Sequence, residues 1–112
     1  PDSSIIRRGL ISKDLESSRF FEGFTVILPA VVRKECDTEA GKRELGRIAD
    51  FASKGRIRLE TIGKIEEIKT LSSLQRDAII TDIALECDAI LITADNSMKA
   101  YSVSKNIFTI YI

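Results

Sequence analysis

The apolar positions of this chain fall into two kinds of pattern along its length. Continuous or alternating apolar runs predict strands at residues 25–28, 56–62, 89–93 and 107–112. Apolar residues spaced three or four apart predict helices at 12–20, 29–35, 64–71, 76–87 and 97–104, and another between Gly41 and Gly55. Strands that alternate with helices predict an α/β sandwich with a mostly parallel central sheet.

Two of the predicted helices have a clear apolar face. In the helix between the two glycines, this face contains Leu45, Ile48, Ala49 and Ala52. In the helix at 76–87, it contains Ile79, Ile80, Ile83, Ala84 and Cys87. Each face predicts the side of the helix that packs on the sheet.

Composition narrows the class of protein. The 112 residues suit one domain spanning 1–112, and 17 basic against 17 acidic side chains exclude a uniformly basic nucleic-acid-binding surface. The sequence has no histidine, which excludes Ser-His-Asp triads and most zinc sites. The two cysteines lack metal-binding spacing, so we expect reduced, packed thiols in a cytoplasmic protein. No apolar run is long enough for a transmembrane helix.

Four acidic residues lie at the edges of apolar segments. Asp95 follows the strand at 89–93, Asp77 lies near the start of a helix, Glu35 follows an apolar stretch and Asp2 precedes another. Sites in parallel sheets form outside the carboxyl ends of the strands. Carboxylates gathered there repel one another unless cations hold them together. The pattern therefore predicts a divalent metal site, with Thr93 and Asn96 as supporting polar groups.

Each acid also has a structural interpretation. Asp95 can cap the helix that follows it, and Asp2 can cap a helix together with Ser3 and Ser4. On the helix at 76–87, the apolar face centres about 90° from Asp77 and about 130° from Asp82. This favours Asp77 as the functional acid, with stabilisation of the helix N-terminus as its alternative.

Basic residues occur in adjacent pairs. Arg7-Arg8 and Arg33-Lys34 lie close in sequence to Asp2 and Glu35. Such pairs usually cover a solvated surface. Beside an acidic pocket they can instead hold the phosphates of a polyanion.

The order of these segments resembles the PIN domain family. The resemblance rests on Pro1-Asp2-Ser3-Ser4, on the Pro-initiated segment from Pro29 to Glu35, and on 77–84 followed by 89–95. The end of the chain is most similar to archaeal PIN domains fused ahead of an ATPase and a KH-type RNA-binding module. The sequence begins at Pro1 without an initiator Met, and we expect an apolar strand before it in a longer protein.

The resemblance implies a three-layer α/β/α sandwich and cleavage of RNA that depends on Mg²⁺ or Mn²⁺, often by a homodimer. It implies that Asp2, Glu35, Asp77 and Asp95 are the catalytic metal ligands, with Asp82 in reserve. It implies that Thr93 orients Asp95 or a water. Asn96 stands where some relatives carry another acid.

A second interpretation stays open. The chain can instead be a non-catalytic domain that binds RNA or dimerises within a larger ATPase-containing protein. That interpretation predicts no turnover with metals.

Overall fold

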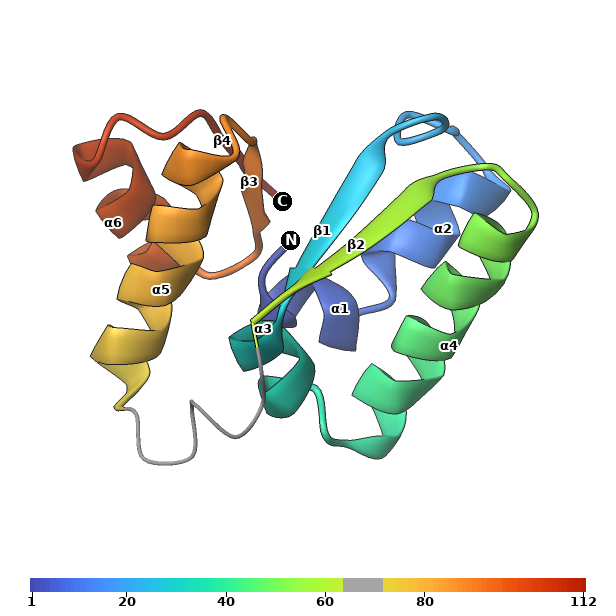
Figure 1. Ribbon diagram of the computed structural model, residues 1–112, viewed down its shortest axis with the longest axis horizontal. Coiled ribbons are helices and arrows are strands. Elements are labelled where there is room, and N and C mark those ends of the chain that lie inside the picture. The colour runs from blue at the N-terminus through green and yellow to red at the C-terminus, as the bar shows by residue number, and fades with distance from the viewer. Residues whose placement is uncertain (64–71) are drawn as a thin grey trace.

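The computed structural model describes residues 1–63 and 72–112 of the chain (Figure 1). The helices are α1 (Ser3–Arg7), α2 (Leu10–Glu16), α3 (Ala30–Glu35), α4 (Glu39–Ser53), α5 (Ser73–Glu86) and α6 (Asn96–Ser104). The strands are β1 (Thr25–Pro29), β2 (Arg58–Ile62), β3 (Leu91–Thr93) and β4 (Thr109–Tyr111). The predicted helix at 64–71 lies outside the described residues.

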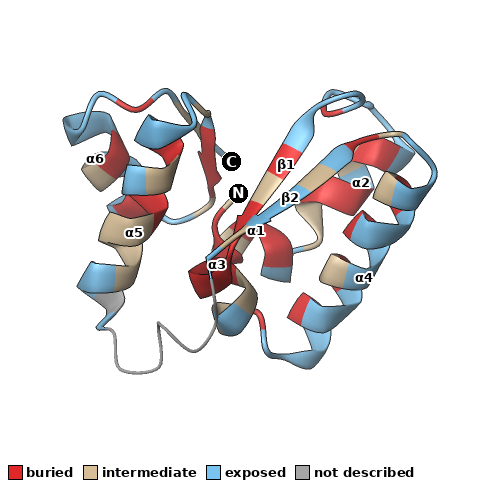
Figure 2. Cartoon of the chain, in the orientation of Figure 1, coloured by how far each residue is buried: buried red, intermediate tan, exposed pale blue. Residues whose placement is uncertain are grey.

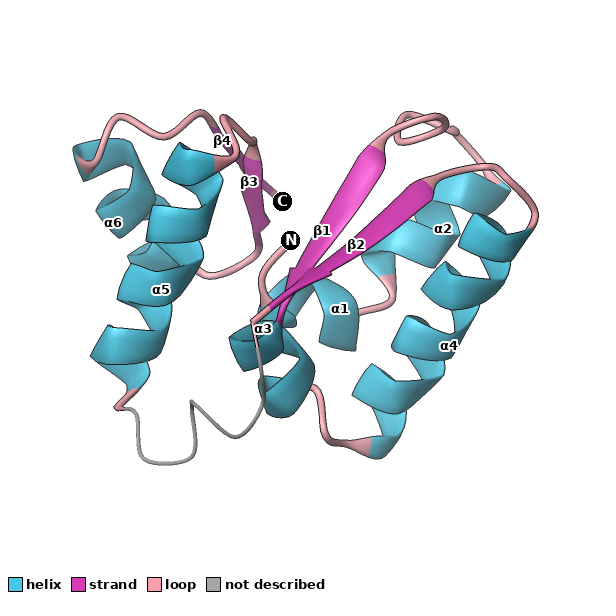
Figure 3. Ribbon diagram, viewed as in Figure 1, coloured by secondary structure: helices cyan, strands magenta, loops and turns pink. Residues whose placement is uncertain are grey.

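The described strands form two parallel pairs (Figure 3). β1 pairs with β2, with Val26 opposite Leu59, and β3 pairs with β4, with Ile92 opposite Ile110. The α/β class and the parallel pairing are therefore confirmed. In the part of the chain that the structure describes, the pairs are separate sheets of two strands each rather than one central sheet.

The N-terminal helices differ from the prediction. Instead of one helix capped by Ser12, α1 begins after Asp2 and α2 begins after Gly9. Gly9 has a φ of 67°, a left-handed conformation that a residue without Cβ adopts at little cost. This turn lets Ile5, Ile6, Ile11 and Leu15 all reach the core, where each is at most 1% exposed. Figure 2 shows buried segments on both α1 and α2.

Helix α4 is longer than predicted and presents a different face. Thr38 caps it, so Gly41 lies inside the helix and does not separate it from α3. Its buried residues are Gly41, Glu44, Ile48 and Phe51. The predicted face was displaced by about one position, because the prediction placed acidic residues such as Glu44 toward solvent. Gly41 is required by contact: a Cβ there would lie 2.3 Å from the carbonyl oxygen of Cys36.

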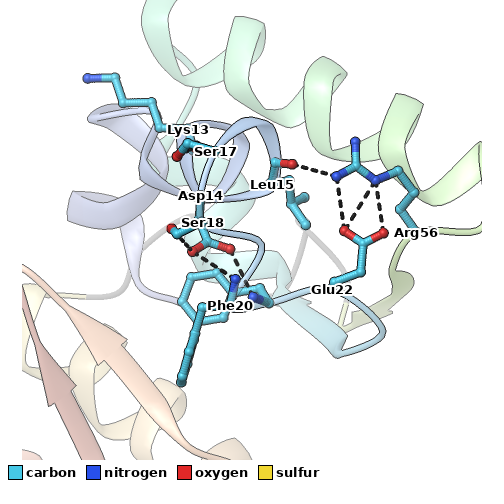
Figure 4. Close-up of polar contacts among 9 residues, drawn as sticks. Lys13, Asp14, Leu15, Ser17, Ser18, Phe20, Glu22 and Arg56 are labelled. Atoms are coloured by element: carbon cyan, nitrogen blue, oxygen red, sulfur yellow. Dashed lines mark hydrogen bonds and ion pairs between the residues drawn. The ribbon is translucent and has the colours of Figure 1, made fainter.

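The turn between α2 and β1 is tied to the rest of the domain by two charged side chains (Figure 4). Asp14 accepts hydrogen bonds from the backbone N–H groups of Phe20 and Phe21, at 3.2 and 2.8 Å. Arg56 donates to both carboxylate oxygens of Glu22 and to the carbonyl of Leu15. These contacts fix the approach of the chain to β1.

The two cysteines are free and lie in different surroundings. Cys36 is buried after α3, as predicted, whereas Cys87 is exposed after α5, so the prediction of a packed thiol there was wrong. Across residues 1–63 and 72–112, no helix has both the length and the apolar character needed to cross a bilayer.

Candidate functional site

The four predicted acids come from four separate places in the fold. Asp2 caps α1, Glu35 ends α3, Asp77 lies in the second turn of α5, and Asp95 caps α6. Their exposure increases from buried Asp2, through half-buried Glu35 and Asp77, to exposed Asp95. Helix α3 directly follows β1, and Asp95 follows β3. Two of the acids therefore lie beyond the carboxyl ends of strands in different sheets.

The charges of these carboxylates affect the pKa values of two of them. Burial raises the pKa of Asp77, and the charges of Asp95 and Asp2 raise it further. Burial also raises the pKa of Glu35, where Arg76 and Arg7 act against the shift and Asp77 and Asp2 add to it. Asp77 is thus coupled to each of the other three acids.

Asp2 is the most firmly held of the acids. Its side chain is 5% exposed, and its Oδ1 accepts from the backbone N–H of Ser4 at 3.1 Å and from the Ser4 hydroxyl at 2.5 Å. Its Oδ2 accepts from the hydroxyl of Thr93 at 2.5 Å. The capping interpretation of Asp2 is therefore confirmed. Oδ1 also accepts from the backbone N–H of Ile5 at 3.4 Å, so the accepting capacity left for a ligand lies on Oδ2.

Thr93 connects Asp2 to the loop that carries Asp95. Its hydroxyl is fully buried, donates to Asp2 and accepts from the backbone N–H of Asp95 at 2.9 Å. A second link runs from the backbone N–H of Ala94 to the Ser4 hydroxyl, at 2.9 Å. Thr93 thus orients the Asp2 side chain and the Asp95 backbone, whereas the resemblance implied that it orients the Asp95 side chain or a water.

Asp95 caps α6 by accepting from the backbone N–H of Ser97 at 2.8 Å, as its structural interpretation predicted. The bond uses Oδ1, and the residue is exposed. Asn96 is also exposed and begins α6. Asp95 is therefore positioned by the helix while its carboxylate stays accessible.

The choice of Asp77 over Asp82 agrees with the burial of the two residues. Asp77 is half-buried and Asp82 is exposed on the same helix. The predicted stabilisation of the helix N-terminus by Asp77 was wrong, because α5 begins at Ser73 under a capping box formed by Ser72 and Gln75. Asp77 lies beyond the first turn, where the field of the helix terminus is weak.

The basic residues divide into those that reach the acids and those that do not. The charges of Arg7 and Arg76 lower the pKa of Glu35, and Arg76 also lowers that of Asp77. Arg33 donates to the carbonyl of Gly63 at 3.3 Å. Arg8 and Lys34 are exposed. Sequence reasoning missed Arg76, although its position beside Asp77 was a usable signal.

Carboxylates are suitable ligands for a divalent cation, but the side chains of these four acids do not surround one point. Within residues 1–63 and 72–112, no three Asp, Glu, Cys or His side chains are close enough together to hold a metal ion. The donors are carboxylate oxygens, which Mg²⁺ and Mn²⁺ prefer. Asp95 is exposed and Asp77 is half-buried.

Together, the fold and the site define a compact α/β domain with coupled carboxylates beyond the ends of two parallel strand pairs. A similar solved structure is described as a domain of a functionally unknown protein from Methanocaldococcus jannaschii DSM 2661. It is 25% identical in sequence, with a TM-score of 0.86 over 99% of this chain and 87% of that chain. This similarity shows a shared fold with a domain of a larger protein. No protein-family model matches the sequence, and no curated protein matches it.

Proposed function

We propose that this chain is a PIN-like ribonuclease domain that hydrolyses RNA phosphodiester bonds with Mg²⁺ or Mn²⁺. The observation that supports the proposal is that the charge of Asp77 interacts with those of Asp2, Glu35 and Asp95, which come from three other elements. The order of these acids along the chain and their resemblance to the PIN family support it. The proposal includes the three-layer α/β/α sandwich of that family.

Each of the four acids would have a different role in the site. Asp2 is buried and held by Ser4 and Thr93, so it would act as a fixed ligand. Asp95 and Asp77 are more accessible and would complete the site by turning toward it. When bound, Mg²⁺ or Mn²⁺ supplies Lewis acidity toward a phosphate oxygen and a water molecule. Glu35, whose pKa is raised by burial, would accept or hold a proton beside this group.

Basic side chains near the acids would position the RNA backbone. Arg7 and Arg76 are the two whose charge reaches Glu35. Arg8, Arg33 and Lys34 would extend this surface and contact phosphates. The choice of RNA, the homodimer, and a parent protein with ATPase and RNA-binding domains rest on the resemblance.

The test is cleavage of a labelled single-stranded RNA with Mn²⁺ or Mg²⁺, with EDTA as the blank. We expect Asp95→Asn and Asp77→Asn to lose at least about 100-fold in rate, because each removes a charged ligand. Asp82→Asn is the matched control, since it makes the same change on the exposed side of α5 and should keep full activity.

A binding measurement separates loss of the cation from loss of the fold. Mn²⁺ should raise the thermal midpoint of the wild type and of Asp82→Asn, but not of Asp95→Asn. Equal cleavage by all variants would refute the proposal, because the activity would then come from a contaminating nuclease.

The geometry of the acids also favours a second candidate, a non-catalytic domain that binds RNA or dimerises. The supporting observation is that, in the described part of the chain, the acids are not gathered to metal-binding distance. This candidate predicts no effect of Mn²⁺ on the thermal midpoint. It also predicts the same RNA affinity for wild type and Asp95→Asn.

A further inference from the structure

Tyr111 is an exposed aromatic residue at the carboxyl end of the β3–β4 sheet. It ends β4 and lies opposite Thr93, the last residue of β3, in the parallel register. The backbone N–H of Ile112 donates to the carbonyl of Thr93 at 3.0 Å, which fixes the end of β4 to the end of β3. Adjacent strands lie about 4.8 Å apart. The backbone of Tyr111 is therefore one strand spacing from the residue that holds Asp2 and Asp95.

Lys99 contacts the ring of Tyr111. Its ammonium nitrogen lies 4.9 Å from the ring centroid, within the range of a cation–π contact. Lys99 is on α6, one turn after Asp95, and its backbone N–H donates to the carbonyl of Asp95 at 3.0 Å. Because residues four apart lie on the same side of a helix, Lys99 and Asp95 share one side of α6. The lysine therefore ties the position of the ring to the helix that carries Asp95.

Two binding groups of this pair are accessible. Tyr111 is 47% exposed, and Lys99 is exposed as well. Within residues 1–63 and 72–112, no carboxylate forms an ion pair with Lys99. An aromatic face stacks with any nucleobase, and an ammonium group binds a phosphate. An apolar peptide would use the ring but leave the lysine charge without a partner, so these groups favour a nucleotide.

We propose that Tyr111 and Lys99 bind one nucleotide of a single-stranded RNA, with the base stacked on the ring and a phosphate paired with the ammonium. This subsite would hold a nucleotide next to the one whose phosphate reaches the acids. Stacking accepts every base, so the subsite would select unpaired over paired RNA rather than a particular sequence. The inference rests on the proposed function, but its binding step is measured without cleavage.

The composition of the chain provides the assay. The sequence has two tyrosines and no tryptophan, so Tyr101→Phe leaves Tyr111 as the only tyrosine, and Tyr111→Phe leaves Tyr101. Tyr101 is the matched control, because it also has a lysine over its ring, but that residue, Lys105, caps the far end of α6. Each variant is titrated with oligoadenylate at low salt in EDTA. We expect saturable quenching of Tyr111 emission by the stacked base, and no saturable quenching of Tyr101.

Affinity measurements then separate the two groups. Tyr111→Ala should weaken binding of oligoadenylate by about tenfold, whereas Tyr111→Phe keeps an aromatic face and should bind as the wild type does. Lys99→Gln should reduce the slope of log affinity against log salt by about 0.7, the value for one phosphate contact on a single strand. Lys105→Gln is its control and should leave the slope unchanged. Circular dichroism melts check that each variant keeps its fold.

Three results would overturn the proposal. The first is equal quenching of the two tyrosines, or unchanged affinity in Tyr111→Ala. The second is an unchanged salt slope in Lys99→Gln, which would limit the lysine to holding the ring. The third is Tyr111 emission that changes with protein concentration in the absence of RNA, because the ring would then be a contact between copies of the chain.

The same measurements distinguish this inference from the proposed function. If Tyr111 is quenched as expected but no variant cleaves RNA with Mn²⁺ or Mg²⁺, the nuclease proposal fails and the nucleotide subsite stands. If the wild type cleaves RNA but Tyr111 is not quenched, the subsite fails and the nuclease proposal stands.

Discussion

Glu44 is the buried charge on which the packing of the N-terminal helices depends. It lies on α4 and is 1% exposed. Its two carboxylate oxygens accept from the backbone N–H of Ser12 at 2.9 Å and from the Ser12 hydroxyl at 2.6 Å. Helix α2 has no side-chain cap of its own at Gly9, so Glu44 satisfies an N–H of its first turn from a neighbouring helix. We predict that Glu44→Ala strongly destabilises the domain.

The size of the effect follows from these contacts. A hydrogen bond to a charged group contributes about 1.5–3 kcal/mol, and the substitution removes two of them. Because the Ser12 N–H is buried, it would be left unsatisfied. We expect Glu44→Ala to lower the free energy of unfolding by about 3–5 kcal/mol, and Glu44→Gln by about 1–2 kcal/mol, since the amide oxygen still accepts.

The assay is urea unfolding followed by circular dichroism, with Glu39→Ala as the control. Glu39 lies on the same helix, its side chain is 91% exposed, and it pairs only with Arg43 among the described ion pairs. Its removal should change stability by less than about 0.5 kcal/mol. A loss below about 1 kcal/mol for Glu44→Ala would refute the reasoning. So would equal losses for Glu44→Ala and Glu44→Gln, because Gln keeps the volume and an accepting oxygen, and the effect would then come from the lost charge and not from the hydrogen bonds.

Three further predictions follow from single contacts and pKa shifts. Gly41→Ala should destabilise by about 1–3 kcal/mol in urea unfolding, because its Cβ would lie 2.3 Å from the Cys36 carbonyl; Gly46→Ala, with nothing within 4 Å, should stabilise by about 0.5–1 kcal/mol. Asp77→Asn should stabilise the metal-free domain near pH 7, because a folded pKa raised above the unfolded one makes stability fall as pH rises through that interval; the gain should vanish in melts below about pH 3, where both states are protonated. In the native chain, iodoacetamide at pH 8 should modify Cys87 before Cys36, as peptide mass mapping would show, and equal rates would contradict the burial of Cys36.

The sequence was sufficient for the elements whose periodicity is set by burial alone. Ile80 and Ala84 of α5 lie in the core as predicted, and the alternating run at 56–62 contains β2. The prediction failed for α4 because Glu44 is buried. Its charge is tolerated through contacts with Ser12, 32 positions away in sequence, and no local pattern contains that information.

In the candidate site, too, local features could be predicted from the sequence, whereas contacts between distant residues could not. Helix geometry separated Asp77 from Asp82, because the angle from an apolar face depends only on the sequence of one helix. The bond from Thr93 to Asp2 joins residues 91 positions apart, so its direction could not be derived from spacing. Arg76 was missed for a different reason. The prediction considered only acidic residues as site residues, whereas the charge of Arg76 lowers the pKa of both Glu35 and Asp77.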